Sequence, residues 1–126
     1  MFNKNAELVK EYVKKLALKK YLEFFYATDV ANHLSLPLKE CLEELDKLVS
    51  QEILHIRYEI RTIPELDLID VVDDYLSVLN TNMSYEDKEY EISYENIFPI
   101  YYIDEEFKKF ELEKVHTYFY SPTRTF

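Results

Sequence analysis

Glycine is absent from all 126 residues of this chain, although average proteins contain about 7%. Because glycine has no Cβ, it adopts positive φ freely and lets the backbone approach a phosphate closely. Turns that need positive φ must use other residues here, and we expect them at Asn80 to Asn82 and at Glu95-Asn96, with some local strain. The glycine-rich loops of nucleotide-binding proteins and the G-x-S-x-G elbow of hydrolases are excluded.

The composition is that of a folded domain. Hydrophobic residues make up 48% and aromatic residues 16% of the chain, whose length suits one compact domain. No run approaches the roughly 18 apolar residues of a membrane span, and residues 1–15 do not resemble a signal peptide, so we expect a cytoplasmic protein without membrane contact. The single Cys41 and three scattered histidines predict no internal disulfide, no metal and no cofactor.

Charge is divided unevenly along the chain. Residues 1–62 carry ten basic and ten acidic side chains, whereas residues 63–126 carry five and fifteen, which accounts for the net charge of −10. Within the first half, residues 4–20 hold six lysines against Glu7 and Glu11, a net charge of +4. This polarity favours a charged partner or head-to-tail self-association.

Hydrophobic spacing in the first half predicts three helices and a strand. Apolar residues recur at helical intervals over 5–19, over 28–34 and, most regularly, over 37–50. Residues 52–61 instead alternate between apolar and polar side chains, which indicates a half-buried strand.

This order of helix, turn, helix and strand resembles the winged helix-turn-helix superfamily over about residues 5–61, with Leu36 as the buried leucine of the turn. The resemblance implies a winged-helix core over residues 1–62, and members of that superfamily often bind DNA. Two features depart from its pattern. Ser50-Gln51-Glu52 replaces the glycine that often ends the long helix, and no wing hairpin is expected directly after the strand.

The second half, residues 63–126, is predicted to be an acidic, aromatic-rich α+β extension packed on the same domain. Apolar spacing predicts a helix over 65–80, and alternation predicts strands over 89–95 and 98–103 that pair with 52–61 in a small antiparallel sheet. Asp104 is placed to cap a short helix, and residues 115–119 suggest a last strand or an extended tail.

The second helix of the helix-turn-helix is a poor DNA reader, because DNA recognition needs hydrogen-bond donors and positive charge. Its expected outward positions carry more carboxylates than amines: Lys39, Glu40, Glu43, Glu44, Asp46, Lys47 and Ser50. DNA binding by a transcriptional regulator is therefore a disfavoured alternative. Its candidate contacts are Lys14, Lys15, Lys39, Arg57 and Arg61.

Twelve tyrosines and eight phenylalanines exceed what a core of this size comfortably hides, and such side chains are common interface anchors. The aromatic anchors predicted for a protein interface are Tyr101, Tyr102, Tyr118, Phe119, Tyr120 and Phe126. A further alternative is an acidic mimic of nucleic acid that inhibits a DNA- or RNA-binding enzyme through Asp70, Asp73 and Asp74. Paired acids and nucleophile motifs are missing, so catalysis is not expected.

The sequence thus predicts an α+β protein with a winged-helix core, an extra helix and a small antiparallel sheet. We expect it to be non-catalytic and to bind another protein or itself, as a homodimer or as a small subunit of a bacterial or phage assembly.

Overall fold

The computed structural model describes residues 3–120, with side chains through His116, and it confirms a mixed α+β fold. The chain divides into two compact units. Among the described residues, unit 1 combines 3–55 with 102–120, and unit 2 is the continuous segment 56–101. The division expected after residue 62 falls inside unit 2, because two long strands pass from one unit into the other.

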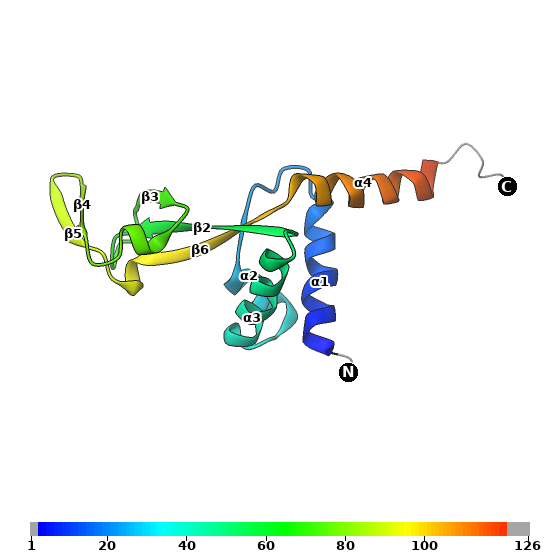
Figure 1. Ribbon diagram of the computed structural model, residues 1–126, viewed down its shortest axis with the longest axis horizontal. Coiled ribbons are helices and arrows are strands. Elements are labelled where there is room, and N and C mark those ends of the chain that lie inside the picture. Colours follow the sequence, from blue (N-terminus) through cyan, green and yellow to red (C-terminus); the bar gives the residue numbers. More distant parts are fainter. Residues whose placement is uncertain (1–2, 121–126) are drawn as a thin grey trace. The chain divides into compact units, whose positions relative to one another are not determined.

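Three helices build the core of unit 1: α1 (Lys4–Ala17), α2 (Ala27–Leu34) and α3 (Leu38–Ser50), as Figure 1 shows. Their apolar faces supply buried side chains at helical spacing, which explains why these segments are helical. The side chain of Asn3 accepts hydrogen bonds from two backbone amides and caps α1. The core includes Val9, Val13, Leu16, Val30, Ala31, Cys41, Leu45 and Leu48. All three predicted helices are confirmed.

A tight turn joins α2 to α3. Ser35 ends α2 in the left-handed conformation, with φ of 54°, and the backbone amide of Leu36 donates to the carbonyl of Ala31 at 2.9 Å. Leu36 is half-buried, and Pro37 directly precedes α3. The predicted local order of helix, turn and helix is therefore confirmed.

The larger sheet has the strand order β1-β6-β2-β3. Its strands are β1 (Phe25–Tyr26), β2 (Leu54–Arg61), β3 (Leu68–Val72) and β6 (Ile97–Ile103). The strands predicted over 52–61 and 98–103 are confirmed as β2 and β6.

The helix predicted over 65–80 is wrong, because β3 occupies its centre. β3 pairs antiparallel with the second half of β2, and Tyr58 lies opposite Val72. Leucines at helical spacing suggested a helix, but the β-branched Ile69, Val71 and Val72 suit a paired strand. Only a single 3₁₀ turn, η1 (Tyr75–Ser77), follows. A hairpin therefore comes directly after β2, contrary to the expected delay.

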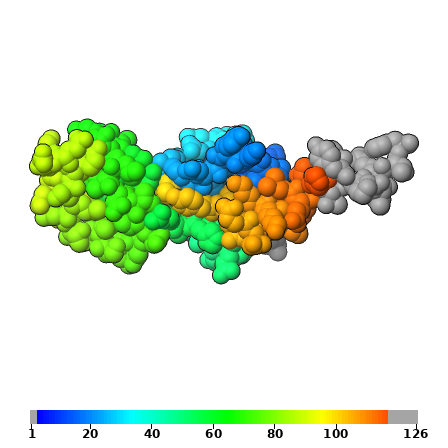
Figure 2. All heavy atoms as spheres, turned by 90° about the horizontal axis from the view of Figure 1, so that it is seen from above, coloured from blue at the N-terminus to red at the C-terminus, as the bar shows by residue number. Residues whose placement is uncertain are grey.

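A second hairpin completes unit 2, whose atoms are green to yellow in Figure 2. It pairs β4 (Asn82–Tyr85) with β5 (Lys88–Glu91). The strand predicted over 89–95 is thus confirmed only over its first three residues, and its predicted pairing with 52–61 is wrong. A short 3₁₀ helix, η2 (Tyr94–Asn96), leads into β6. The buried apolar residues of unit 2 are few: Ile60, Ile92, Ile100 and Tyr101.

One long helix, α4 (Glu105–Tyr120), replaces the expected short helix and final strand. It begins where Oδ2 of Asp104 accepts a hydrogen bond from the amide of Phe107 at 3.1 Å, which confirms the predicted cap. The helix contacts α1, and its later turns extend away from that helix (Figure 1). The alternation over 115–119 was too short to outweigh continuation of the helix.

Positive φ occurs at six residues in the described part of the chain. Asn80 was expected, but Asn82 and Asn96 lie in regular structure and are not among them. Glu86 and Asp87 form the two-residue turn between β4 and β5, where a type I′ turn needs positive φ twice. The full set is Ser35, Glu52, Leu66, Asn80, Glu86 and Asp87.

Candidate protein interaction site

The turn between β2 and β3 is closed by hydrogen bonds centred on Thr62, which is buried. Its amide donates to the carbonyl of Asp67 at 2.9 Å, and its carbonyl accepts from the amide of Leu66 at 2.9 Å. The Thr62 hydroxyl oxygen accepts a third bond, from the amide of Asp67 at 3.0 Å. These three hydrogen bonds join the two ends of the turn and define its shape.

Arg61 braces the same turn from the strand side. Its guanidinium donates to both carboxylate oxygens of Glu59, at 3.1 and 3.0 Å, and to the carbonyl of Leu66 at 2.7 Å. Residues two apart on a strand point to the same face, which brings Glu59 and Arg61 together. The carbonyl of Arg61 accepts from Nδ2 of Asn96 at 2.9 Å, so the start of β6 is tied to the turn.

The braced turn presents apolar side chains to solvent. Ile63 is 41% exposed, Leu66 47% and Leu68 41%, and Pro64 between them is also exposed. We call these four residues the apolar turn. Solitary exposed apolar residues are ordinary, but a contiguous group on a rigid support marks an interaction surface.

Leu66 carries the clearest sign of strain. Its φ is 64°, in the left-handed region that disfavours a leucine because Cβ approaches the backbone. Asparagine or glycine at this position would relieve the strain. Leu66 therefore combines an exposed side chain with a strained backbone, a combination found at many functional sites.

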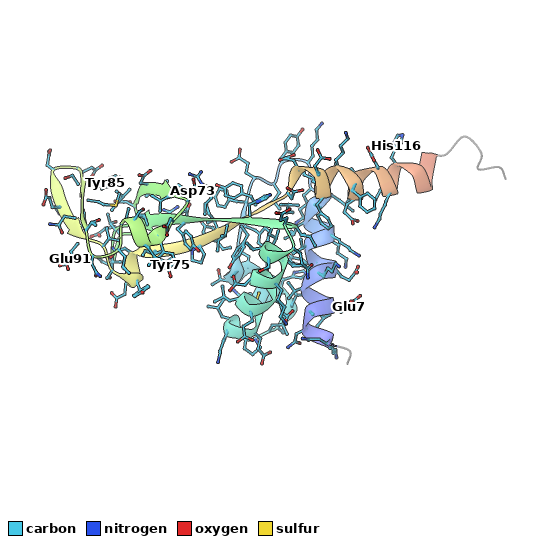
Figure 3. The ribbon with its side chains drawn as sticks, viewed as in Figure 1. Glu7, Asp73, Tyr75, Tyr85, Glu91 and His116 are labelled. Atoms are coloured by element: carbon cyan, nitrogen blue, oxygen red, sulfur yellow. The ribbon has the colours of Figure 1, made fainter. Side chains whose placement is uncertain are left out.

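The surroundings of the apolar turn are acidic. Glu65 and Asp67 are exposed within it, and Asp70 is exposed on β3. Partial burial, and then the carboxylates of Glu86 and Asp67, raise the pKa of Tyr85, a residue of the second hairpin labelled in Figure 3. The apolar turn is therefore rimmed by negative charge.

The candidate DNA contacts are largely engaged by carboxylates. Nε of Arg57 donates to Asp73 at 2.7 Å, and Asp73 is labelled in Figure 3. Arg61 is held by Glu59, and Nζ of Lys14 lies 3.2 Å from Glu11. Lys15 and Lys39 are exposed, but they lie on different helices.

The exposed face of α3 carries one carboxylate fewer than predicted. Glu44 was expected to face outward, but it is buried, with Oε1 accepting from Nζ of Lys47 at 3.0 Å and from Nδ2 of Asn3 at 3.4 Å. Asn3 precedes α1, and this contact explains the burial. The exposed carboxylates of α3 still outnumber its amines: Glu40, Glu43 and Asp46 against Lys39 and Lys47.

The predicted aromatic anchors are dispersed. Tyr101 is buried in the core of unit 2, and Tyr102 is partly buried in unit 1 with its ring 5.8 Å from that of Phe24. Tyr118, Phe119 and Tyr120 belong to the last turn of α4, but their side chains lie outside the described residues, as does Phe126. In the described part of α4, Phe110, Leu112 and Val115 are exposed.

The predicted decoy carboxylates have local roles. Asp73 pairs with Arg57, Asp74 accepts from the amide of Leu76 at 3.0 Å and caps η1, and Asp70 accepts from the amide of Val71 at 2.8 Å. They belong to one sheet edge and the loop after it.

Nε2 of His55 lies 2.8 Å from Asp104, and this pair joins β2 to the start of α4. Among residues 3–116, no three His, Cys, Asp or Glu side chains are grouped as metal ligands would be. None of the helices over residues 3–120 combines the length and apolar character that crossing a bilayer requires.

Comparison with protein-family models gives no match, and comparisons with curated proteins and with solved structures give none either. A proposal of function therefore depends on the geometry of the described residues.

Proposed function

We propose that this chain is a non-catalytic protein interaction module on a winged-helix scaffold, and that the apolar turn is its contact surface. The observation that carries the proposal is Leu66, an exposed leucine kept in a strained conformation by hydrogen bonds at both its amide and its carbonyl. Such preorganisation reduces the conformational entropy lost on binding.

The winged-helix part of the proposal is supported by element order. A helix-turn-helix formed by α2 and α3 leads into β2, and the β2–β3 hairpin follows directly, where the sequence had suggested a helix. The apolar turn is the tip of this hairpin. We propose that the hairpin serves protein contact, because its arginines are occupied by carboxylates and its rim is acidic.

Site-specific photo-crosslinking tests the proposal. A photoreactive phenylalanine at position 66, in cells of the organism that encodes the chain, is expected to form a discrete crosslinked protein species. The matched control is position 76, because Leu76 is more exposed, at 63%, and lies in the same unit outside the apolar turn. Equal crosslinking at both positions, or none at position 66, would contradict the proposal.

A further inference from the structure

We propose that the apolar turn docks on the outer face of α1 of a second copy of this chain, so that copies associate head to tail. This inference rests on the proposed function and names the partner of the same site. It joins a surface of unit 2 in one copy to a surface of unit 1 in the next.

The outer face of α1 has the composition that the apolar turn requires. Val9 and Val13 face the core, which leaves Leu8, Lys15 and Leu18 together on the opposite side of the helix, at i, i+7 and i+10. Leu8 is 36% exposed and Leu18 40%. Two solvent-facing leucines thus flank an exposed lysine.

Further lysines surround these leucines. Lys4 and Lys19 are exposed near the two ends of the same helix. Of the two glutamates on this helix, Glu11 is paired with Lys14 at 3.2 Å, while Glu7 near the amino end is exposed. Residues 4–20 therefore keep a net charge of +4 around an apolar centre.

The apolar turn is the electrostatic complement of this face. Residues 62–70 contain three carboxylates, Glu65, Asp67 and Asp70, and neither lysine nor arginine. Both surfaces consequently expose leucines, with an excess of carboxylates near one and an excess of lysines near the other. Contact would bury leucine against leucine while opposite charges meet around the edge, which favours correct orientation and rapid encounter.

The two surfaces differ, so the interface is heterologous. Each docking event leaves one apolar turn and one α1 face unused, and a heterologous contact generates rings or open chains of copies. An interface of this size is small, and we expect weak association that depends on concentration and salt. The assembly should therefore grow past a dimer as concentration rises.

Sedimentation velocity and light scattering on the full chain provide the first test. The purified protein should increase in mean mass with concentration, and association should weaken between about 0.01 M salt, where the Debye length is about 30 Å, and about 1 M, where it is about 3 Å. Leu66→Asn should lower the association constant about ten-fold, since one leucine is lost from the contact. Leu76→Asn is the matched control and should leave it unchanged.

A mixing experiment tests the geometry. Leu66→Asn retains a working α1 face, and Lys15→Glu combined with Leu18→Asn retains a working apolar turn. Each variant alone should be predominantly monomeric, whereas an equimolar mixture should form a one-to-one heterodimer that grows no further. Circular dichroism first establishes that both variants fold. Asp67→Lys provides a second arm, because it should restore association with a Lys15→Glu copy.

The results separate this inference from the proposed function. A strictly monomeric protein, or a mixture that forms no heterodimer, overturns head-to-tail docking. If position 66 then crosslinks to a different protein, the interaction module stands and only its partner changes. If position 66 crosslinks to nothing, both proposals fall.

Discussion

Arg61 binds the buried carboxylate of Glu59 with two nitrogens and the carbonyl oxygen of Leu66 with a third. One guanidinium therefore neutralises the polar residue inside the sheet and fixes the backbone of the exposed turn. The first contact stabilises the fold, and the second shapes the proposed contact surface.

Arg61→Ala should lower the free energy of unfolding by about 3 kcal/mol, because the Glu59 side chain, only 3% exposed, would keep a buried charge without its partner. Arg57→Ala is the matched control: it breaks a pair with Asp73, which is 85% exposed, and should change stability by less than about 1 kcal/mol. Urea unfolding followed by circular dichroism measures both. Equal losses would contradict the assigned role of Glu59.

Leu66→Asn should leave the melting temperature unchanged or raise it, because asparagine tolerates positive φ, whereas a leucine in this region costs about 1 kcal/mol. Leu66→Val should lower the melting temperature, since a β-branched side chain fits this backbone worse. Thermal unfolding distinguishes the two variants. A lower melting temperature for Leu66→Asn would show that the exposed leucine contributes to folding.

Asp104→Asn should lower the free energy of unfolding at pH 7, and this loss should be smaller in acid. The hydrogen bond with His55 and that from the amide of Phe107 lower the pKa of Asp104 in the folded state. The ionised carboxylate thus contributes stability that is present above the unfolded pKa, near 3.9, and is lost as pH falls through the folded pKa.

Unfolding of this variant and of wild type, compared from about pH 7 down to about pH 3, measures the effect, since the unfolded pKa lies within that range. Asp87→Asn is a suitable control, because Asp87 is exposed in a hairpin turn and asparagine tolerates its positive φ. A stability difference between Asp104→Asn and wild type that did not shrink in acid would exclude this carboxylate as its source.

Cys41 should resist thiol reagents in the folded protein. Burial raises its pKa to about 11, and its thiol lies 3.6 Å from the carbonyl oxygen of Ala27. At pH 8 only about one thiol in a thousand would be ionised, and the thiolate is the reactive form. Reaction with a disulfide reagent should therefore be slow in buffer and fast in urea. Rapid labelling in buffer would mean that the α2–α3 packing opens readily.

The sequence predicted the parts of the fold whose pattern is local and long. The helices containing Val13 and Leu45, and the strand containing Ile60, follow from apolar spacing over ten residues or more. The segment containing Val71 was misassigned, because its leucines match a helix while its partner residues lie seven to fourteen positions earlier in the chain. Strand pairing depends on that partner, which local spacing does not describe.

The candidate site was less predictable. The excess of exposed apolar side chains and the acidic second half were visible in the sequence. The predicted interface residues were aromatic, however, whereas the exposed apolar residues of the proposed contact surface are Ile63, Leu66 and Leu68. The pairing of Glu59 with Arg61 follows from strand periodicity once burial of Glu59 is known. The absence of glycine was the available signal for Leu66, since some non-glycine residue had to adopt positive φ.

Unit 1 is built from two separated stretches, and α4 reaches α1 only after residues 56–101 have been made. During synthesis, at roughly 5 to 20 residues per second, α1 emerges several seconds before α4, the helix that contacts it. Unit 2 is continuous and its hairpins are local. Its strands can therefore pair before the last part of unit 1 has been synthesised. The proposed contact surface would then form on the nascent chain before the helical unit is finished.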